Sequence, residues 1–341
     1  VSSATNSFIT QIGGFVGHLS TSDISGPDGV LVVNLPGQHS LYAGDGNSTL
    51  KGFNVNAGYA PLPNTPLATG PASDKRVDEM AFNPTGQRLL VVNDAATPSP
   101  FISLINTTNN TIAVKTVFNG LNGTPNATMG LEQPVWDPTT QKFYLSMPQN
   151  NGTGPGAIAE IDSTTGAVTH VFNLGDFGIS SCGPTGLARG TGGRLLIGCG
   201  NAGTQSILFN PQANGGNGAI IKTFSQVSGS DQVWYDPTTH RFFITAANNI
   251  GGPVLGIVGL DGTFLGDLTT SPGAHSVAVD PVTGEIFVPF GGIAGNTTCP
   301  NGCIAVYTPN AAVPEPPTLP LLATFVTLLL GAAWKTGRRT H

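Results

Sequence analysis

The chain has 341 residues, of which only 9% are charged, while 47 are glycine and 27 are proline. This composition excludes a protein built mainly of long helices, because glycine and proline interrupt helices, and it favours short strands joined by many turns. The net charge of −6, with no cluster of Lys and Arg among aromatic residues on a predicted strand, argues against nucleic acid as a partner.

The N-terminal residues give a first indication of where the protein acts. The sequence begins at Val1 without Met or an apolar signal segment, so we expect that an export leader has been removed. We also expect residues 8–16 to form a strand beside residues 304–308. Such a strand would join the two ends of a closed structure.

A repeated hairpin dominates residues 25–308. Each copy has an apolar strand, a turn that usually contains Asn-Pro or Asp-Pro, a polar or basic residue, and a second apolar strand, as in residues 80–92. The turn residues, which lie 44 to 54 positions apart, are Asn34, Asn83, Asp137, Arg189, Asp236 and Asp280. Further strand-like segments follow each hairpin, which makes four strands per repeat the natural count.

This period predicts an all-β fold, a β-propeller of about six four-stranded blades, with seven as the alternative count. A single sheet of this kind cannot bury both faces, so the sheets must stack. We favour a ring over an open solenoid, because a ring removes exposed sheet edges. The predicted domains are the propeller at 1–310, a proline-rich linker at 311–318, and an apolar segment with a basic tail at 319–341, whose apolar part should form a short helix.

The four cysteines predict disulfide bonds. Cys182 begins one apolar strand and Cys199 ends the next, so antiparallel pairing of these strands would bring the two sulfurs together. Cys299 and Cys303 bracket a tight turn that a disulfide could also close. A metal site made of the four cysteines is less favoured, because no His has zinc-finger spacing.

The C-terminal tail carries three elements in a fixed order. A Pro-Glu-Pro motif at 314–316 is followed by sixteen mostly apolar residues at 319–334 and then by Lys335, Arg338 and Arg339. This order resembles the PEP-CTERM sorting signal of Gram-negative bacteria. The resemblance implies export, transient membrane contact through the tail, cleavage by an exosortase-like sorting protease, and a final place in the envelope or outside the cell. An ordinary single-span anchor is the alternative.

The repeat also predicts where a site would form. In a propeller, the innermost strand of each blade starts on the face where the second strand ends, so these positions converge on one mouth of the central channel. The residues five positions before the turns are Gly29, Asp78, Glu132, Pro184, Asp231 and His275. The ends of second strands add neutral or acidic groups predicted to bind a substrate or to complete a metal site: Asn93, Asp94, Asn201, Asn248 and Asn249.

Carboxylates and an imidazole at equivalent blade positions predict one divalent metal. Its ligands would be Asp78, Glu132, Asp231 and His275, with Ca²⁺ favoured and Zn²⁺ or Mn²⁺ as alternatives. A bound metal could polarise a carbonyl and activate water, with Glu132, Asp231 or His275 as the catalytic acid–base group. The alternative is that these side chains only cap strands and satisfy loop amides.

Residues 80–92 and 277–288 resemble the blades of YVTN-type and lactonase-like propellers, which carry an apolar, Asp-Pro, Thr-Gly, basic, apolar pattern. Gluconolactonase and regucalcin-like members hold a divalent metal with Glu, Asn and Asp from several blades. Asp231 and Glu132 match such positions, whereas Asp78 and His275 stand where that family has a neutral Asn. The resemblance implies a metal-dependent lactonase or ester hydrolase and leaves its metal and substrate open.

Two functions follow from these patterns. The first is an envelope-associated, metal-dependent hydrolase that acts on a small molecule at the channel mouth. The second is a non-catalytic propeller that binds polysaccharide or protein partners in the extracellular matrix. The concentration of acidic residues in one place favours the enzyme slightly, although the fold alone cannot separate the two.

Overall fold

The structure, a computed structural model, describes residues 2, 4–16, 28–201, 203–291, 299–300 and 302–308. The chain divides into two units, Val1–Tyr307 and Thr308–His341. The predicted linker at 311–318 and the predicted helix and basic tail at 319–341 lie outside the described residues. Within the described residues, none of the helices has the length and apolar character needed to span a lipid bilayer.

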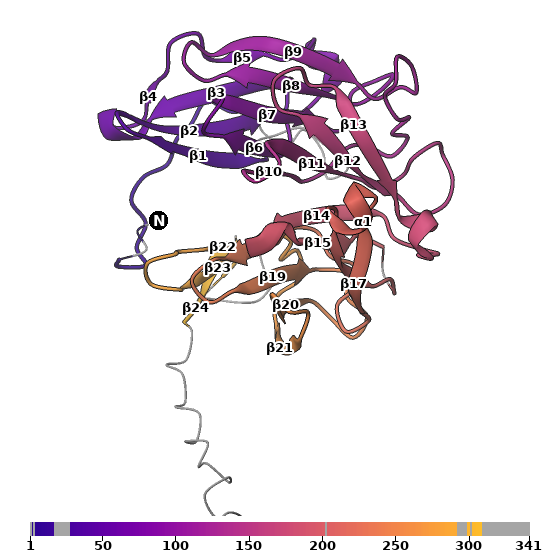
Figure 1. The fold of residues 1–341 in the computed structure, drawn as a ribbon. Coiled ribbons are helices and arrows are strands. Elements are labelled where there is room, and N and C mark those ends of the chain that lie inside the picture. Colours follow the sequence, from indigo (N-terminus) through magenta and orange to yellow (C-terminus); the bar gives the residue numbers. More distant parts are fainter. Residues whose placement is uncertain are drawn as a thin grey trace, which may run out of the picture. The chain divides into compact units, whose positions relative to one another are not determined.

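The first unit consists of six antiparallel sheets, each built from one continuous stretch of the chain (Figure 1). In each sheet, the main strands pair in the order in which they occur in the sequence. The innermost strands of consecutive sheets lie next to each other, from β1 and β6 through β10, β14 and β18 to β22. The predicted all-β propeller with six blades is therefore confirmed.

The strands have the following bounds. Blade 1 contains β1 (Val30–Leu35), β2 (Gln38–Asp45), β3 (Thr49–Asn54) and two short strands that pair with β3, β4 (Ala60–Pro61) and β5 (Leu67–Ala68). Blade 2 contains β6 (Met80–Asn83), β7 (Arg88–Asn93), β8 (Phe101–Asn106) and β9 (Thr111–Val117). Blade 3 contains β10 (Pro134–Asp137), β11 (Lys142–Met147), β12 (Ala157–Asp162) and β13 (Val168–Asn173).

The second half of the ring follows the same pattern. Blade 4 contains β14 (Pro184–Arg189), β15 (Leu195–Cys199), β16 (Ser206–Asn210) and β17 (Ala219–Phe224), with a single helical turn, α1 (Ala213–Gly216), between the last two strands. Blade 5 contains β18 (Val233–Asp236), β19 (Arg241–Ala246), β20 (Val254–Gly259) and β21 (Phe264–Thr269). Blade 6 has three strands among the described residues, β22 (Ala278–Val279), β23 (Ile286–Phe290) and β24 (Cys303–Tyr307).

The Asp-Pro turns of the repeat close the hairpins between first and second strands. Asp137 Oδ1 accepts a hydrogen bond from the Thr139 amide at 2.9 Å, and Asp236 Oδ1 accepts one from the Thr238 amide at 2.9 Å. The proline between them has no N–H to donate, so the Asp side chain satisfies the next amide instead. The recurring sequence pattern is thus a recurring turn.

Buried apolar clusters join the blades that follow one another in the sequence. Five of them link blades 1 to 2, 2 to 3, 3 to 4, 4 to 5 and 5 to 6. Among the described residues no such cluster links blade 6 to blade 1, where Val30 and Val32 of β1 are 64% and 52% exposed. They line a groove of about 670 Å³ together with Phe287 and Ile304 of blade 6, and this groove is called the seam groove below.

The prediction that residues 8–16 form a strand beside blade 6 is wrong. The described residues 8–16 form no strand, and the end of this segment lies against blade 1. The Val16 amide donates to Asp45 Oδ1 at 3.0 Å, and the Phe15 ring lies 6.2 Å from that of Phe53. Lys51 contributes as well, because it forms an ion pair with the buried Asp45 and stands over the Phe15 ring.

Both predicted disulfides are confirmed. Cys182 precedes β14 and Cys199 ends β15, and their Cα atoms lie 5.0 Å apart. Cys299 and Cys303 close the turn before β24, with Cα atoms 5.5 Å apart. Disulfides of this kind persist in oxidising compartments, so they point to a protein that works outside the cytoplasm.

Candidate functional site

The starts of several innermost strands bring charged side chains to one mouth of the ring, called the acidic mouth below. Asp78 precedes β6, Glu132 precedes β10, Asp231 precedes β18 and His275 precedes β22. Burial raises the pKa of Glu132 well above its usual range, and the negative charge of Asp231 raises it further. The structure therefore gathers these predicted residues in one place.

Arg76 is the hub of one side of this mouth. Its guanidinium nitrogens lie 2.6 Å from Asp28 Oδ2, 3.0 Å from Asp78 Oδ2 and 3.7 Å from Asp94 Oδ2. Burial raises the pKa of Asp78 well above its ordinary value, the charge of Asp94 adds to this, and Arg76 opposes it. Arg76 thus compensates carboxyl groups that the fold has removed from water.

Two glutamines, each directly following a predicted ring residue in the sequence, form hydrogen bonds to other blades. Gln232 Nε2 of blade 5 donates to Glu79 Oε1 of blade 2 at 2.7 Å. Gln133 Oε1 of blade 3 accepts from the amide of Leu187 in blade 4 at 2.7 Å and from the amide of Val233 in blade 5 at 3.1 Å. These bonds tie four blades together across the centre of the ring.

Asp231 and His275 form the accessible part of the mouth. His275 Nδ1 lies 3.3 Å from Asp231 Oδ2, and the two side chains are 52% and 42% exposed. The hydrogen bond with Asp231 raises the pKa of His275, and partial burial opposes this effect. Both side chains are therefore accessible to a ligand from the solvent.

The neutral residues predicted to bind a substrate have mostly structural contacts. Asn93 is buried, and its Nδ2 donates to Ser48 Oγ at 3.0 Å. Asn201 Oδ1 accepts from the Gly183 amide at 2.9 Å, and Asn248 is exposed after β19 in blade 5. Of the predicted set, only Asp94 is bonded into the charged cluster, through Arg76. Substrate binding by these residues stays a prediction.

Two of the four predicted metal ligands are already paired with other side chains. Asp78 is held by Arg76, and Asp231 is held by His275. No three His, Cys, Asp or Glu side chains of the described residues are grouped so that they could hold a metal ion. As they stand, these side chains do not fit a divalent ion, so no step through a metal is derived, and the metal stays a prediction.

Sequence reasoning missed several residues of the mouth. Glu79, Gln133 and Gln232 each follow directly after a predicted ring residue, so an acidic residue and then a hydrogen-bonding side chain recur at the start of three inner strands. That repetition was the available signal. Arg76 had none, because it lies outside the repeated hairpin and its role depends on which carboxyl groups the ring brings near it.

Comparison with protein-family models and with curated proteins gives no match. Solved structures do match. Raptor from Chaetomium thermophilum has a TM-score of 0.55 at 14% identity, and the match covers 84% of this chain but only 24% of that one. A chain of the Mitotic Checkpoint Complex has a TM-score of 0.52 at 14% identity, with 79% of this chain and 74% of that chain covered.

These similarities support the six-bladed β-propeller fold and nothing finer, because identity this low carries no information about chemistry. This chain spans about a quarter of the Raptor chain. The resemblances to YVTN-type and lactonase-like blades and to the PEP-CTERM tail stay predictions.

Proposed function

We propose that this chain is an exported β-propeller that binds a cationic, partly apolar segment of a protein partner at its acidic mouth. The excess of acidic groups carries the proposal. In the described residues, the basic side chains paired with the cluster are Arg76 and His275. The carboxyl groups are Asp28, Asp78, Asp94, Glu132 and Asp231, beside Glu79, whose pKa of about 8 keeps it protonated at neutral pH.

Burial and mutual repulsion make ionisation of several of these carboxyl groups unfavourable, and a bound cation would offset that cost. Burial raises the pKa of Glu132, and neighbouring carboxylates raise it further. Asp94 is buried, and its Oδ1 has no hydrogen-bond partner among the residues that the structure describes. An ammonium or guanidinium group of a ligand would supply both the missing donor and the missing charge.

The seam groove supplies the apolar half of the proposed site. Its walls include Val30, Val32 and Ile304, and its lining also contains Asp28 and Glu79 of the acidic mouth. A volume of about 670 Å³ lies within the usual range of ligand clefts. The chemistry that matches is a peptide with Lys or Arg beside aliphatic residues. Its basic group would face Asp28, and its aliphatic groups would face the apolar walls of the groove.

Export through the sorting tail belongs to this proposal and is supported by the two disulfides. A propeller of similar fold occurs in the Mitotic Checkpoint Complex, so the fold is compatible with protein partners. The metal-dependent lactonase is the second candidate. The concentration of carboxyl groups at one mouth favours it, but binding of a metal would require these side chains to leave their present partners.

The test is fluorescence anisotropy with a short labelled peptide of alternating leucine and lysine. We expect saturable binding that weakens as salt is added, because exposed charge pairs are screened. The double variant Asp231→Asn with Glu132→Gln should lose about tenfold or more in affinity, equivalent to about 1.4 kcal/mol. It should lose little thermal stability, since the Asp231–His275 pair is largely exposed and Glu132→Gln removes a carboxyl group whose ionisation burial disfavours.

Three controls make the result specific. Asp267→Asn removes an exposed carboxylate of β21 and should leave binding unchanged. Peptides with glutamate in place of lysine, or serine in place of leucine, should bind much more weakly. Titration with Ca²⁺, Mn²⁺ or Zn²⁺ alone, followed by a lactone panel, tests the enzyme: metal uptake with hydrolysis and no peptide binding would replace this proposal by the lactonase.

A further inference from the structure

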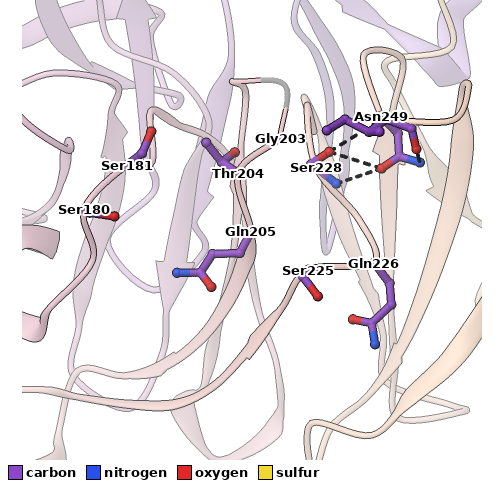
Figure 2. A pocket seen from close by; sticks show the side chains of 10 residues that line it. Ser180, Ser181, Gly203, Thr204, Gln205, Ser225, Gln226, Ser228 and Asn249 are labelled. Atoms are coloured by element: carbon purple, nitrogen blue, oxygen red, sulfur yellow. Dashed lines mark hydrogen bonds between the residues drawn. The ribbon is translucent and has the colours of Figure 1, made fainter.

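A second pocket, called the polar pocket below, lies between blades 4 and 5 (Figure 2). It is formed by the segments that lead into β14, β16, β18 and β20, which all lie on the face where inner strands begin. Its volume is about 550 Å³. We propose that this pocket binds a neutral saccharide, which goes beyond the function proposed above.

The lining of the polar pocket is uncharged. Ser180, Ser181, Gln205, Ser225 and Gln226 present hydroxyl and carboxamide groups, and none of these five side chains makes a hydrogen bond within the described residues (Figure 2). Each group can both donate and accept. The pocket therefore offers a set of unused hydrogen-bonding groups without any charge.

The walls around these free groups are held in place. Ser228 donates from its amide and its hydroxyl to Asn249 Oδ1, at 3.0 and 3.2 Å (Figure 2). On the opposite wall, Ser181 is followed by Cys182, which the disulfide ties to β15. A ligand would therefore meet walls that are already ordered, so binding costs less conformational entropy.

A saccharide is the ligand class that matches this chemistry. Its hydroxyl groups donate and accept like the serine and glutamine groups of the lining. A charged ligand would lose water without finding a counter-charge, which is unfavourable. Ile250, which is 72% exposed at the rim, offers an apolar surface for the C–H face of a sugar ring. The volume again lies in the range of ligand clefts.

The test is isothermal titration calorimetry with a panel of neutral cello-, malto- and xylo-oligosaccharides. We expect at least one to bind with a Kd below about 1 mM. The double variant Gln205→Ala with Gln226→Ala should weaken that binding about tenfold, because it removes two carboxamide groups that would hydrogen bond to the ligand. Ser225→Trp, which fills the pocket, should abolish it.

Two control variants separate this site from others. Gln11→Ala changes an exposed glutamine on the N-terminal segment and should leave saccharide affinity unchanged. Asp231→Asn weakens the acidic mouth and should also leave it unchanged, so failure of one site does not count against the other. The proposal is overturned if no neutral oligosaccharide binds, if Gln205→Ala with Gln226→Ala binds as well as the wild type, or if acidic oligosaccharides bind more tightly.

Discussion

The side-chain amide of Gln232 donates to the carboxyl group of Glu79 at 2.7 Å, although the two residues belong to blades 2 and 5 and lie 153 positions apart. Burial raises the pKa of Glu79 to about 8, and the charge of Asp231 adds to the effect. At neutral pH, Glu79 therefore carries its proton and acts as a neutral acceptor. The centre of the ring is closed by a bond between two uncharged groups.

Because Glu79 is protonated in the folded chain, the free energy of unfolding depends on pH. The pKa of Glu79 is about 8 in the folded chain against an ordinary value of 4.5. An acid whose pKa rises on folding contributes stability that is complete below 4.5 and is lost as pH rises through 8. Each pH unit in that window removes up to about 1.4 kcal/mol.

Glu79→Gln should remove this dependence. The new amide oxygen can still accept from Gln232, and no proton is lost as pH rises. Urea unfolding measured across the window should show a flatter pH profile and a variant more stable than wild type above pH 8. Asp267→Asn, at an exposed position, should keep the wild-type slope. Equal slopes for Glu79→Gln and wild type would contradict the protonated state of Glu79.

The pair of Asp231 and His275 allows a second titration experiment. Its hydrogen bond raises the pKa of His275, so the stability it adds is complete below the ordinary pKa of 6.5 and is lost as pH rises through the folded value. Asp231→Asn should lower the pKa of His275, as followed by the NMR shift of the imidazole Cε1 proton. Asp267→Asn is the matched control, and an unchanged His275 titration in Asp231→Asn would mean that the pair does not form.

Much of the fold was predictable because its information is local. Asp137 and Asp236 close their turns with atoms two residues away, so the repeat in the sequence is a repeat in the backbone. Counting five residues back from the turns therefore predicted that Asp78, Glu132 and His275 lie at the same mouth of the ring. The topology of a ring converts equal positions in the repeat into spatial proximity.

The partners of these residues were less predictable, because they depend on distances between blades. Arg76 follows Lys75 outside the repeated hairpin, so the repeat does not mark it, yet it lies among Asp28, Asp78 and Asp94. The N-terminal segment was misassigned for the same reason. Its preference for blade 1 depends on Asp45, a carboxyl group whose availability cannot be read from segment 8–16 itself.

Blades 1 and 2 approach each other so closely at the mouth that position 29 should tolerate only glycine. A Cβ atom added to Gly29 would lie far inside the van der Waals radius of the Asp78 carbonyl oxygen. Gly29→Ala should therefore lower the unfolding free energy by about 1–3 kcal/mol, because the packed strands must separate. Gly13→Ala, where an added Cβ meets nothing, should be neutral in the same urea titration. Equal stability of the two variants would contradict this packing.

The two disulfides should differ in their contribution to stability. Cys182 and Cys199 lie 17 positions apart and are both buried, whereas Cys299 and Cys303 are separated by only 4 positions. The loss of chain entropy on crosslinking grows with loop length, to about 3 kcal/mol for a loop near fifteen residues. Cys182→Ala with Cys199→Ala should therefore destabilise the protein more than Cys299→Ala with Cys303→Ala.

Thermal unfolding of the two double variants measures this difference. We expect the Cys182–Cys199 variant to lose about 1 kcal/mol more than the other, since the crosslink closing the longer loop restricts the unfolded chain more strongly. The first disulfide also anchors the wall that carries Ser181, so the same variant should bind neutral oligosaccharides more weakly even below its unfolding temperature. Removal of the second disulfide, which is not part of the polar pocket, should leave that affinity unchanged. Equal losses of stability in the two double variants would show that loop length does not govern these crosslinks.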